Sequence, residues 1–485
     1  MRGLPHWVDE LASRVEEFLR TRGKNVYVFN GGLSVSGLQH LGRLRGEVLI
    51  GEAVRRILER KGYKIKQYVT LYTQDPWKGK ERQLEQFPDP RKAARYAGWP
   101  LIKVPDPKGC HSSWVEHFWE DFGGFLDSFT DGKIEVVTTT ELYKGALKEV
   151  VKEMLRKREL ARIVVNKYRG RRPYPEGWIP VEAVCGRCGR IDSTEALRLM
   201  GDDEVEYVCR SCGYRGVARI EDGKVNWRLE WPGVWKALGV DFEPYGKDHA
   251  APGGSRDSCV EISRKVLGYE PPMGVPYEWV AVRFDGGEAD MSSSDFIGVT
   301  PREWLEVANA EVLRFLYFQT PPMRKVVISL REVPSYYERF YQAERVYYGV
   351  DEAPKGEDEE VLKRSYELSL LREAGSVMPV QVPYTHMALM SQVLPRDKRL
   401  EEALRRLRSS GHLKRPPSEQ DVERISSLIE KSLNWVRKYA PPAYRIKVLE
   451  SVTEDLKSKI AMRDQLRELA SVLRALDEWN EGSIK

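Results

Sequence analysis

The sequence predicts an α/β domain built on a parallel sheet, with an inserted module that carries paired cysteines, followed by an α-helical domain. Three observations lead to this prediction. Strand and helix patterns alternate through the first part of the 485 residues, two Cys-x-x-Cys pairs interrupt the alternation, and amphipathic helical patterns replace strands after about residue 335. At about 100–200 residues per domain, this length allows three to four domains.

The N-terminal region predicts a helix and then a strand–helix–strand unit. Residues 6–22 have the apolar spacing of an amphipathic helix, and the apolar run 25–29 ("NVYVF") indicates a buried strand. A helical pattern over 45–62 ends in glycine, and 63–73 alternates as a strand does. Ligands of open parallel sheets bind at the carboxyl ends of strands, so the loop after the first strand is a candidate site.

The pattern continues to about residue 320 and then changes. Residues 74–110, rich in Pro, Lys, Arg and Gly, predict a long functional loop. Further elements are expected as helix 114–129, a strand within 134–143 and helix 146–162, with strand–helix patterns again over 235–320. The amphipathic helices of the C-terminal part are expected at 359–371, 400–410, 422–439 and 463–479.

Composition favours an enzyme of the cytoplasm. Hydrophobic residues are 41% and charged residues 31% of the chain, which excludes a disordered protein. No apolar run approaches the roughly 18 residues of a membrane span, and the N-terminus has no signal-peptide core. The net charge of +5, from 78 basic and 73 acidic residues, permits a nucleic-acid partner without requiring one.

Four of the six cysteines form two Cys-x-x-Cys pairs, namely Cys185, Cys188, Cys209 and Cys212. Each pair is followed by a glycine, Gly189 or Gly213, as in the knuckles of a zinc ribbon. In a chain without a secretion signal, this spacing indicates a metal site and not disulfides. Because protein would fill all four positions, the predicted Zn²⁺ is structural. Cys110 and Cys259 have no partner in the sequence, and we expect them to be inert.

Residues 34–45, "SVSGLQHLGRLR", carry more polar chemistry than a strand-to-helix turn requires. A glycine-rich turn at a helix N-terminus forms an anion site, because backbone N–H groups and the helix dipole face the ligand. Gly37 and Gly42 allow a close approach of the backbone, His40 can donate to a phosphate, and Arg43 adds a positive charge. The alternative is a capped helix with an incidental histidine.

This stretch resembles the "HIGH" signature of class I aminoacyl-tRNA synthetases. A second stretch, 286–298 ("GGEADMSSSDFIG"), is similar to their "KMSKS" loop, and it follows the first in the expected order. Further stretches resemble class I lysyl-tRNA synthetase in particular: 106–118, 140–155, 226–258, 271–280, 311–322, 366–371 and 434–450. The resemblance extends over nearly the whole chain and implies a Rossmann-type catalytic domain.

The resemblance implies that the protein activates L-lysine with ATP and transfers the lysyl group from lysyl-adenylate to the 3′ end of tRNA(Lys). Such chemistry needs no protein nucleophile, because catalysis consists of positioning and charge stabilisation. The implied catalytic residues are His40, Gly42, Arg43, Ser292, Ser293 and Ser294. The implied ATP-binding residues are Ser36, Gly37, His40, Gly42 and Met291, and ATP is expected to bind with Mg²⁺.

The resemblance also assigns the amino-acid pocket. Gly32 and Ser34 would hold the α-amino end of lysine. The other implied substrate-binding residues are Asp75, Trp227, Asp248, His249 and Tyr277. Trp227, His249 and Tyr277 would surround the aliphatic stem, whereas Asp248 would bind the ribose or a substrate amine. Without the resemblance, core packing is the alternative interpretation of Trp227 and Tyr277.

The chain departs from the family pattern in two places. Asp290 and Asp295 occupy both lysine positions of the second signature, where cations normally neutralise the triphosphate, and Phe296 replaces its glycine. Tyr72 and Thr73 stand where the family has carboxylates that select the substrate ammonium. These departures favour an alternative, a catalytically weakened relative that binds tRNA or a nucleotide. A third hypothesis is an adenylating enzyme for another amine-bearing acid.

The resemblance also implies a domain organisation, in which a Rossmann domain is split by an insertion. The expected parts are 1–105, the first half of the Rossmann domain; 106–225, the connective insertion with the zinc ribbon; 226–265, the second half; 266–335, the stem-contact region with the KMSKS-like loop; and 336–485, an α-helical anticodon-binding domain that is short at its C-terminus. We expect a cytoplasmic monomer that binds tRNA(Lys), lysine and ATP and has no membrane partner.

Overall fold

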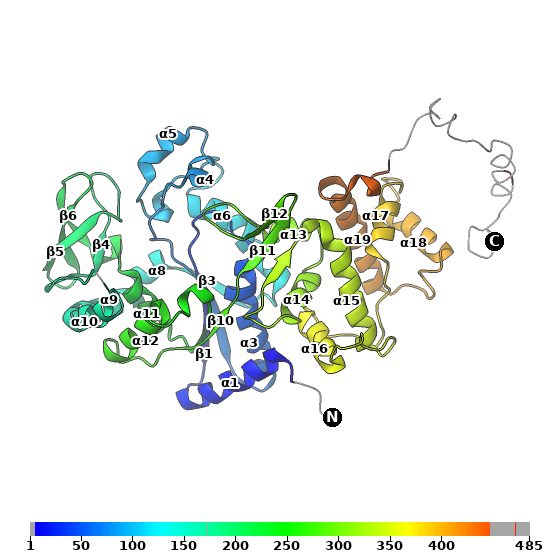
Figure 1. Cartoon of the computed structure of the whole chain (residues 1–485), viewed down its shortest axis with the longest axis horizontal. Helices are drawn as coiled ribbons and strands as arrows, with labels where there is room; N and C mark the ends of the chain where they lie inside the picture. The colour runs from blue at the N-terminus through cyan, green and yellow to red at the C-terminus, as the bar shows by residue number, and fades with distance from the viewer. Residues whose placement is uncertain (1–4, 171, 447–470, 472–485) are drawn as a thin grey trace. The chain divides into compact units, whose positions relative to one another are not determined.

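The computed structural model describes residues 5–170, 172–446 and 471, and the chain divides into two compact units (Figure 1). The first unit consists of Met1–Arg302, Arg314–Ile328 and Leu368–Leu371. The second consists of Glu303–Leu313, Ser329–Glu367 and Arg372–Lys485. In the described part of the chain, no helix is both long enough and apolar enough to cross a membrane.

The first unit is built on a five-stranded parallel sheet of order β10-β9-β1-β2-β3, which confirms the predicted α/β class. The strands are β1 (Tyr27–Leu33), β2 (Ile65–Leu71), β3 (Ile134–Thr138), β9 (Phe242–Gly246) and β10 (Met273–Tyr277). The strand order reverses direction between β1 and β9. In sheets of this kind the crevice beside such a reversal, at the carboxyl ends of the strands, is where ligands bind.

Helix α1 (Trp7–Arg22) confirms the first predicted helix. It begins where His6 Nδ1 accepts the backbone N–H of Val8 at 3.2 Å, and it ends at Gly23, whose φ of 60° is left-handed. The buried side chains Val8, Leu11, Ala12, Val15 and Leu19 form the face expected from the apolar spacing. Helix α3 (Ile50–Arg60) packs against α1 and covers β1, β2 and β9.

The helix after β1 is longer and less regular than predicted. It begins four residues before the expected start as α2 (Leu41–Arg43), continues as a π-helical stretch (Leu44–Leu49) and ends as α3 (Ile50–Arg60). A π-helical turn adds a residue to the normal helical repeat and is frequent at functional sites. Apolar periodicity alone does not reveal such a turn.

The π-helical stretch lies unusually close to the sheet. A Cβ atom on Gly31 of β1 would lie 2.0 Å from the carbonyl oxygen of Glu47, and one on Gly46 would lie 2.1 Å from the ring of Tyr277 at the end of β10. Only glycine therefore permits these two contacts. Arg45, on the same stretch, donates to the backbone carbonyls of Thr320, Pro321 and Arg324 at 2.9–3.1 Å and so anchors the helix on its other side.

Between β2 and β3 the predicted long loop contains only short helices: α4 (Glu81–Leu84), α5 (Pro90–Ala93) and two 3₁₀ turns (Ala94–Tyr96 and Leu101–Lys103).

Two predicted helices are each divided. Helix 114–129 becomes α6 (Trp114–Gly123) and α7 (Leu126–Phe129), separated at Gly124. Helix 146–162 becomes α9 (Ala146–Arg156) and α10 (Arg158–Lys167), separated at Lys157; α8 (Thr139–Tyr143) precedes them.

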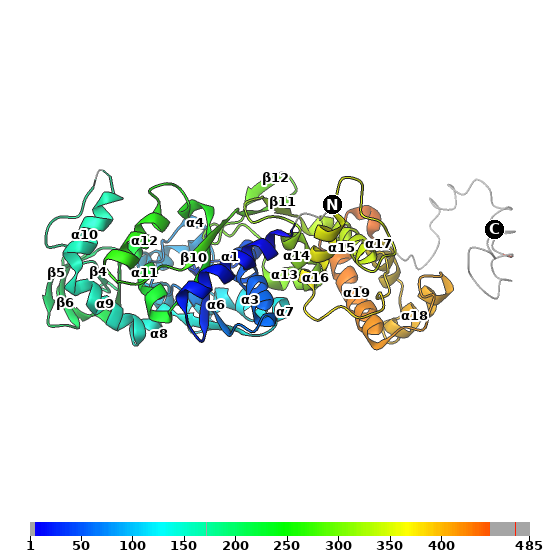
Figure 2. The ribbon, with the colours of Figure 1, turned by 90° about the horizontal axis from the view of Figure 1, so that it is seen from below.

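The cysteine-bearing module consists of two small antiparallel sheets. Their strands are β4 (Val181–Ala183) with β8 (Gly223–Val225), and β5 (Thr194–Met200), β6 (Glu204–Cys209) and β7 (Arg215–Arg219). Cys185 and Cys209 belong to a hydrophobic core that also includes residues of α9, α10, α11 (Trp227–Leu238) and α12 (Ser255–Lys265). Figure 2 shows these four helices beside one another. The module thus shares a core with these helices of the first unit.

A third sheet follows β10, with β11 (Val280–Phe284) between antiparallel β12 (Gly287–Asp290) and parallel β13 (Val326–Ile328). The β11–β12 hairpin leads directly into residues 291–298. This connection places the KMSKS-like stretch at the end of a hairpin.

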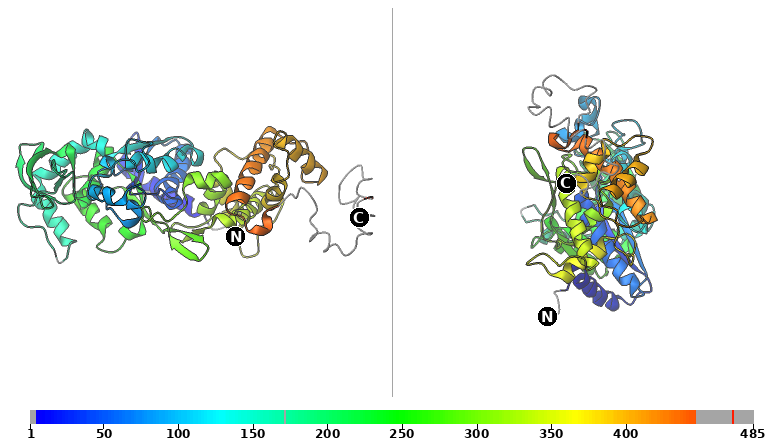
Figure 3. Two further views of the ribbon diagram at one scale, coloured as in Figure 1. Left: turned by 90° about the horizontal axis from the view of Figure 1, so that it is seen from above. Right: turned by 90° about the vertical axis from the view of Figure 1, so that its right-hand side faces the viewer.

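The second unit is helical, as predicted. Helices α15 (Val333–Tyr347), α16 (Glu359–Ser369), α17 (Tyr384–Ser391), α18 (Arg399–Ser409) and α19 (Glu419–Lys438) lie together (Figure 3). Tyr384 packs between Tyr337 and Trp435, with ring centroids 4.8 and 5.7 Å away. Helices α13 (Pro301–Val307) and α14 (Ala310–Phe318) contribute residues to both units. Of the four predicted C-terminal helices three are confirmed, and 463–479 lies outside the described residues except for residue 471.

Replacing Gly31 with alanine should damage the fold locally, because the new methyl group would overlap a backbone carbonyl that cannot move away freely. We expect Gly31→Ala to lower the free energy of unfolding by about 3 kcal/mol, measured by denaturant titration. Gly375→Ala is the matched control, since its nearest neighbour lies 4.0 Å from the added atom. Equal stability of the two variants would show that the helix can withdraw from β1.

Candidate active site

A cavity of about 460 Å³ opens beside the strand reversal, at the carboxyl ends of β1 and β9. The predicted catalytic, ATP-binding and substrate-binding residues all line it except Gly37. Segments that are far apart in the sequence therefore meet at one place, although the individual roles stay predictions. Gly37 lies just behind the wall, where a Cβ atom would be 2.4 Å from the carbonyl oxygen of Ser293. The two signature stretches are thus in direct contact.

His40 occupies the residue before helix α2 and is buried, with 8% of its surface exposed. Its Nδ1 has no hydrogen-bond partner within the described structure. Burial, with a smaller contribution from the positive charge of Arg43, lowers the pKa of His40 to about 3. The imidazole is therefore neutral at physiological pH and can act as an uncharged hydrogen-bond donor. Gly42 leaves room for it, because a Cβ there would lie 3.0 Å from Nδ1.

Residues 291–298 form a closed turn. The backbone N–H groups of Ser292 and Ile297 each donate to the other residue's carbonyl, at 2.7 and 3.0 Å. Phe296 adopts a left-handed φ of 55°, a conformation that glycine takes more easily. Its ring packs on Phe118 and Trp114 of α6, with centroids 5.2 and 6.2 Å away. This aromatic contact explains how a bulky residue can hold the position of a glycine.

Both acidic replacements in this turn are paired with lysines. Lys80 Nζ lies 2.9 Å from the carboxylate of Asp295 and also donates to Ser294 Oγ at 2.8 Å. Lys325 Nζ lies 2.9 Å from Asp290. The hydroxyl of Ser292 and the ammonium of Lys80 lower the pKa of Asp295, which is therefore ionised. The two acidic side chains are thus neutralised by lysines elsewhere in the chain, which sequence reasoning missed.

Aromatic rings form one side of the cavity. Trp227, the first residue of α11, lies with its ring centroid 5.2 Å from Tyr72, 5.3 Å from Trp231 and 6.1 Å from His249. His249 Nδ1 is 2.6 Å from Ser255 Oγ, and burial lowers the pKa of this histidine. The cavity therefore offers apolar faces and neutral polar groups to an aliphatic stem.

The loop after β2 differs from the expected carboxylate cluster. Asp75 is bound by the buried ammonium of Lys224 at 2.5 Å, and Glu230 binds the same ammonium at 2.8 Å. Thr73 is turned to α8, where its backbone N–H donates to Thr139 Oγ1 at 3.0 Å. Tyr72 lines the cavity with a buried hydroxyl that lacks a partner in the described structure. Glu47 also lines the cavity, and sequence reasoning did not identify it.

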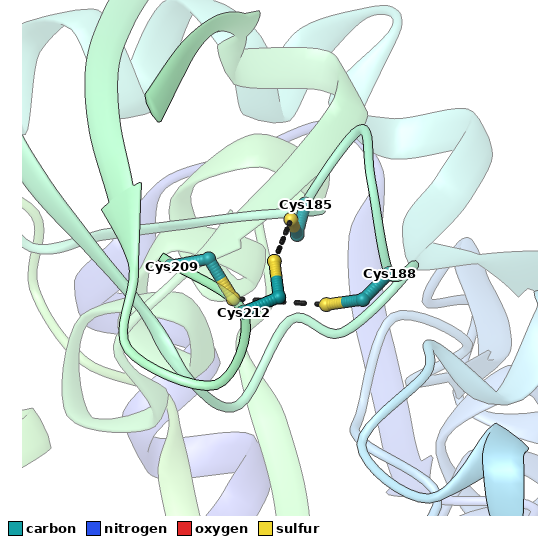
Figure 4. Close-up of side chains that lie close together, drawn as sticks. All are labelled: Cys185, Cys188, Cys209 and Cys212. Carbon is teal, nitrogen blue, oxygen red and sulfur yellow. Dashed lines mark hydrogen bonds between the residues drawn. The ribbon is translucent and has the colours of Figure 1, made fainter. Parts of the chain in front are cut away.

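The four paired cysteines form one cluster (Figure 4). Sγ of Cys185 lies 3.6 Å from that of Cys212, and Sγ of Cys188 lies 3.7 Å from that of Cys209. A tetrahedral zinc ion with Zn–S bonds of about 2.3 Å requires sulfur–sulfur separations of about 3.8 Å. The cluster therefore fits zinc with all four positions filled by protein. Gly189 and Gly213, the glycines that follow the two pairs, have left-handed φ values of 77° and 72°, which glycine adopts easily.

A second cluster could also hold a metal ion: Asp106, Cys110, His111 and His117. Cys110 Sγ lies 3.1 Å from His111 Nδ1 and 3.3 Å from His117 Nδ1, and Asp106 lies 3.1 Å from His117. The expectation that Cys110 lacks partners is wrong, because they lie within seven residues along the chain. The sequence spacing D-x₃-CH-x₅-H, from Asp106 to His117, could have indicated this cluster. For Cys259, burial raises the pKa of the thiol to about 12, which agrees with the expected inertness.

Helix α6 connects this second cluster to both signature stretches. His117 belongs to the cluster, whereas Trp114 Nε1 donates to the carbonyl of Val35 at 3.1 Å and Phe118 contacts Phe296. The cluster thus lies one helical turn from the side chains that hold the cavity wall.

A parallel sheet with these two stretches at its carboxyl edge is the arrangement implied for a class I aminoacyl-tRNA synthetase. Residues 5–372 match the family model described as tRNA synthetases class I (K). The chain is 56% identical to the lysine–tRNA ligase of Aeropyrum pernix, over 99% of this chain and 88% of that protein. It is 33% identical to the lysine–tRNA ligase of Pyrococcus horikoshii, over 98% and 88%. The chain belongs to the class I lysyl-tRNA synthetase family.

Metal analysis should distinguish the two clusters. We expect elemental analysis of purified protein to detect zinc, and Cys188→Ser to remove one equivalent because three thiolates no longer close the site. Since the cluster shares a core with α9 and α11, the variant should also melt at lower temperature. Cys259→Ser is the control and should keep the full metal content. Absence of zinc and iron from the wild-type protein would exclude a Cys₄ metal site.

Proposed function

We propose that the protein is a lysine–tRNA ligase, which condenses L-lysine with ATP and transfers the lysyl group to the 3′ end of tRNA(Lys). The observation that carries this proposal is the meeting of both signature stretches, at Gly37 and Ser293, in a cavity at the strand reversal. Identity of 56% with a lysine–tRNA ligase, over nearly the whole of this chain, supports the choice of amino acid.

On the nucleotide side, the chain positions phosphates and supplies no covalent nucleophile. Ser36, Gly37 and Gly42 would let the phosphates and adenosine approach the backbone, and Met291 would cover the base. The neutral His40 would donate to an α-phosphate oxygen as negative charge develops there. Arg43, which donates to Ser293 Oγ at 3.0 Å, would add positive charge. ATP would bring Mg²⁺, and Asp248 and Asp290 line the cavity with oxygen donors of the kind that this ion prefers.

On the amino-acid side, Gly32 and Ser34 would face the α-amino end, and the rings of Trp227 and Tyr277 would enclose the aliphatic stem. Asp75 is not a free carboxylate in this arrangement, because Lys224 binds it. Asp248, half exposed, is left to bind the ribose or an amine.

The weakened-relative alternative depends on Asp290 and Asp295. Their ion pairs with Lys325 and Lys80 provide nearby cations, so the acidic turn does not by itself argue for lost activity. We therefore favour an active ligase. We further propose that it acts as a cytoplasmic monomer, with the helical second unit as the part that contacts the anticodon.

ATP–pyrophosphate exchange with each of the twenty amino acids, with and without tRNA, tests the proposal. We expect exchange with lysine alone and lysylation of tRNA(Lys). His40→Ala should lower the exchange rate by at least about 100-fold with little loss of stability, because the lost donor acts on the transition state. Since the pKa of His40 is about 3, the pH profile of the exchange rate should show no titration of this histidine near pH 6.5. Exchange with another amino acid only would refute the lysine assignment.

The pair formed by Lys80 and Asp295 gives a second, separable prediction. Lys80→Met should slow exchange about 10-fold and raise the KM for ATP, because one well-placed cation contributes about 1.4 kcal/mol or more to a phosphoryl transition state. Exchanging both charges, Lys80→Asp with Asp295→Lys, should restore most of the rate. Lys78→Met, at an exposed position in the same loop, is the control. Wild-type kinetics in Lys80→Met would exclude a role for this lysine.

A further inference from the structure

Glu47 projects into the cavity from the π-helical stretch Leu44–Leu49. Only 8% of its surface is exposed. One carboxylate oxygen accepts the hydroxyl of Tyr277 at 2.5 Å, and the other accepts the backbone N–H of Gly32 at 3.1 Å. These two bonds tie the carboxylate to the ends of β10 and β1, so its position in the cavity is fixed.

No cation pairs with this carboxylate in the described part of the chain. Arg43, on the same helix, donates to Ser293, and Arg45 is used by backbone carbonyls. Burial raises the pKa of Glu47 to about 8, although the bond from Tyr277 opposes the shift. A buried carboxylate without a cation is costly. Binding of a positively charged ligand would therefore be favourable, because it would offset this cost.

The other carboxylates of the cavity are differently placed. Asp75 is bound by Lys224 and Asp290 by Lys325, whereas the Asp248 side chain is half exposed. Glu243 is likewise buried and without an ion pair in the described structure, but it does not line the cavity. Its oxygens accept the indole N–H groups of Trp231 and Trp235 and the amide of Asn30, so its hydrogen-bonding capacity is used.

We infer that Glu47 binds an ammonium group of the amino-acid substrate. The inference rests on the proposed function and adds a substrate-binding residue to it. Tyr277, which orients the carboxylate, also lines the cavity, as does Trp227, so the cavity combines charge with aromatic side chains. An ammonium ion with an alkyl stem is complementary to this combination.

Amino-acid analogues test the assignment. Exchange is measured for wild type, Glu47→Gln and the control Glu59→Gln with three substrates: L-lysine, L-norleucine, which lacks the side-chain ammonium, and 6-aminohexanoate, which lacks the α-amino group. Glu59 lies on the same helix but pairs with Arg55 and Lys133. Glutamine keeps the shape of the side chain and its bond with Tyr277, so thermal melting should change little.

We expect Glu47→Gln to raise the KM for lysine at least about 30-fold while the KM for ATP stays within about twofold, because only the ammonium contact is lost. The preference for lysine over one analogue should collapse. Collapse against norleucine identifies the side-chain ammonium as the bound group, and collapse against 6-aminohexanoate identifies the α-amino group. Unchanged preferences in a lysine-activating enzyme would overturn the inference alone. Absence of lysine activation by wild type would overturn both it and the proposed function.

The pH dependence supplies a readout that a structural role would not alter. Lysine binds to the ionised carboxylate, so its KM should fall as pH rises towards 8 in wild type, and this dependence should vanish in Glu47→Gln. The groups facing Glu47 are Tyr277 from β10, Glu243 from β9 and Arg43 on its own helix. Of these, Tyr277 has a pKa raised well above 10 by burial and does not titrate in this range. An identical pH profile in both proteins would contradict the assignment.

Discussion

The close contact between Gly31 of β1 and the carbonyl of Glu47 is the constraint on which the cavity depends. It brings a helix against the middle of the sheet at a distance that only a glycine allows. The π-helical turn at this point directs Glu47 into the cavity. His40 immediately precedes the same helix, and Gly42 lies in its first turn. A normal helical turn would direct position 47 differently, because its side chains are spaced by about 100°. His40 and Glu47, on different parts of the cavity lining, are therefore positioned by one element.

The other wall depends on contacts between distant segments. Residues 291–298 are held by the aromatic rings of α6 and by Lys80, they lie against Gly37, and the next residue, Val299, accepts the backbone N–H of Leu41. An exposed ion pair contributes little stability in water, about 0–1 kcal/mol. The Lys80–Asp295 pair, about two-fifths exposed, is therefore better understood as placing charge than as holding the fold. The packing of Phe296 on Phe118 supplies the apolar part of the attachment.

Much of this architecture is predictable because its signals are local. An apolar run identified β1 and alternation identified β2. The Cys-x-x-Cys spacing identified the cysteine cluster, and the two signature stretches identified the cavity. Predictions failed where tertiary contacts determine the local structure. The π-helical turn is set by the approach to Gly31, and the division of helix 146–162 at Lys157 has no marker such as proline. The lysine that neutralises Asp295 lies 215 residues away in the sequence, so only the folded chain reveals it.

The order of strands in the sheet has a consequence for synthesis of the chain. β1 lies between β2 and β9, and the hydrogen bond from Val28 to Asp241 spans 213 residues. At about 5–20 residues per second, a ribosome needs roughly 10–40 s to make that length. During this time one edge of β1 has no strand to pair with, and such an edge invites association with other chains. The cysteine module is translated within the same interval, so it can bind metal and fold before β9 emerges and completes the sheet.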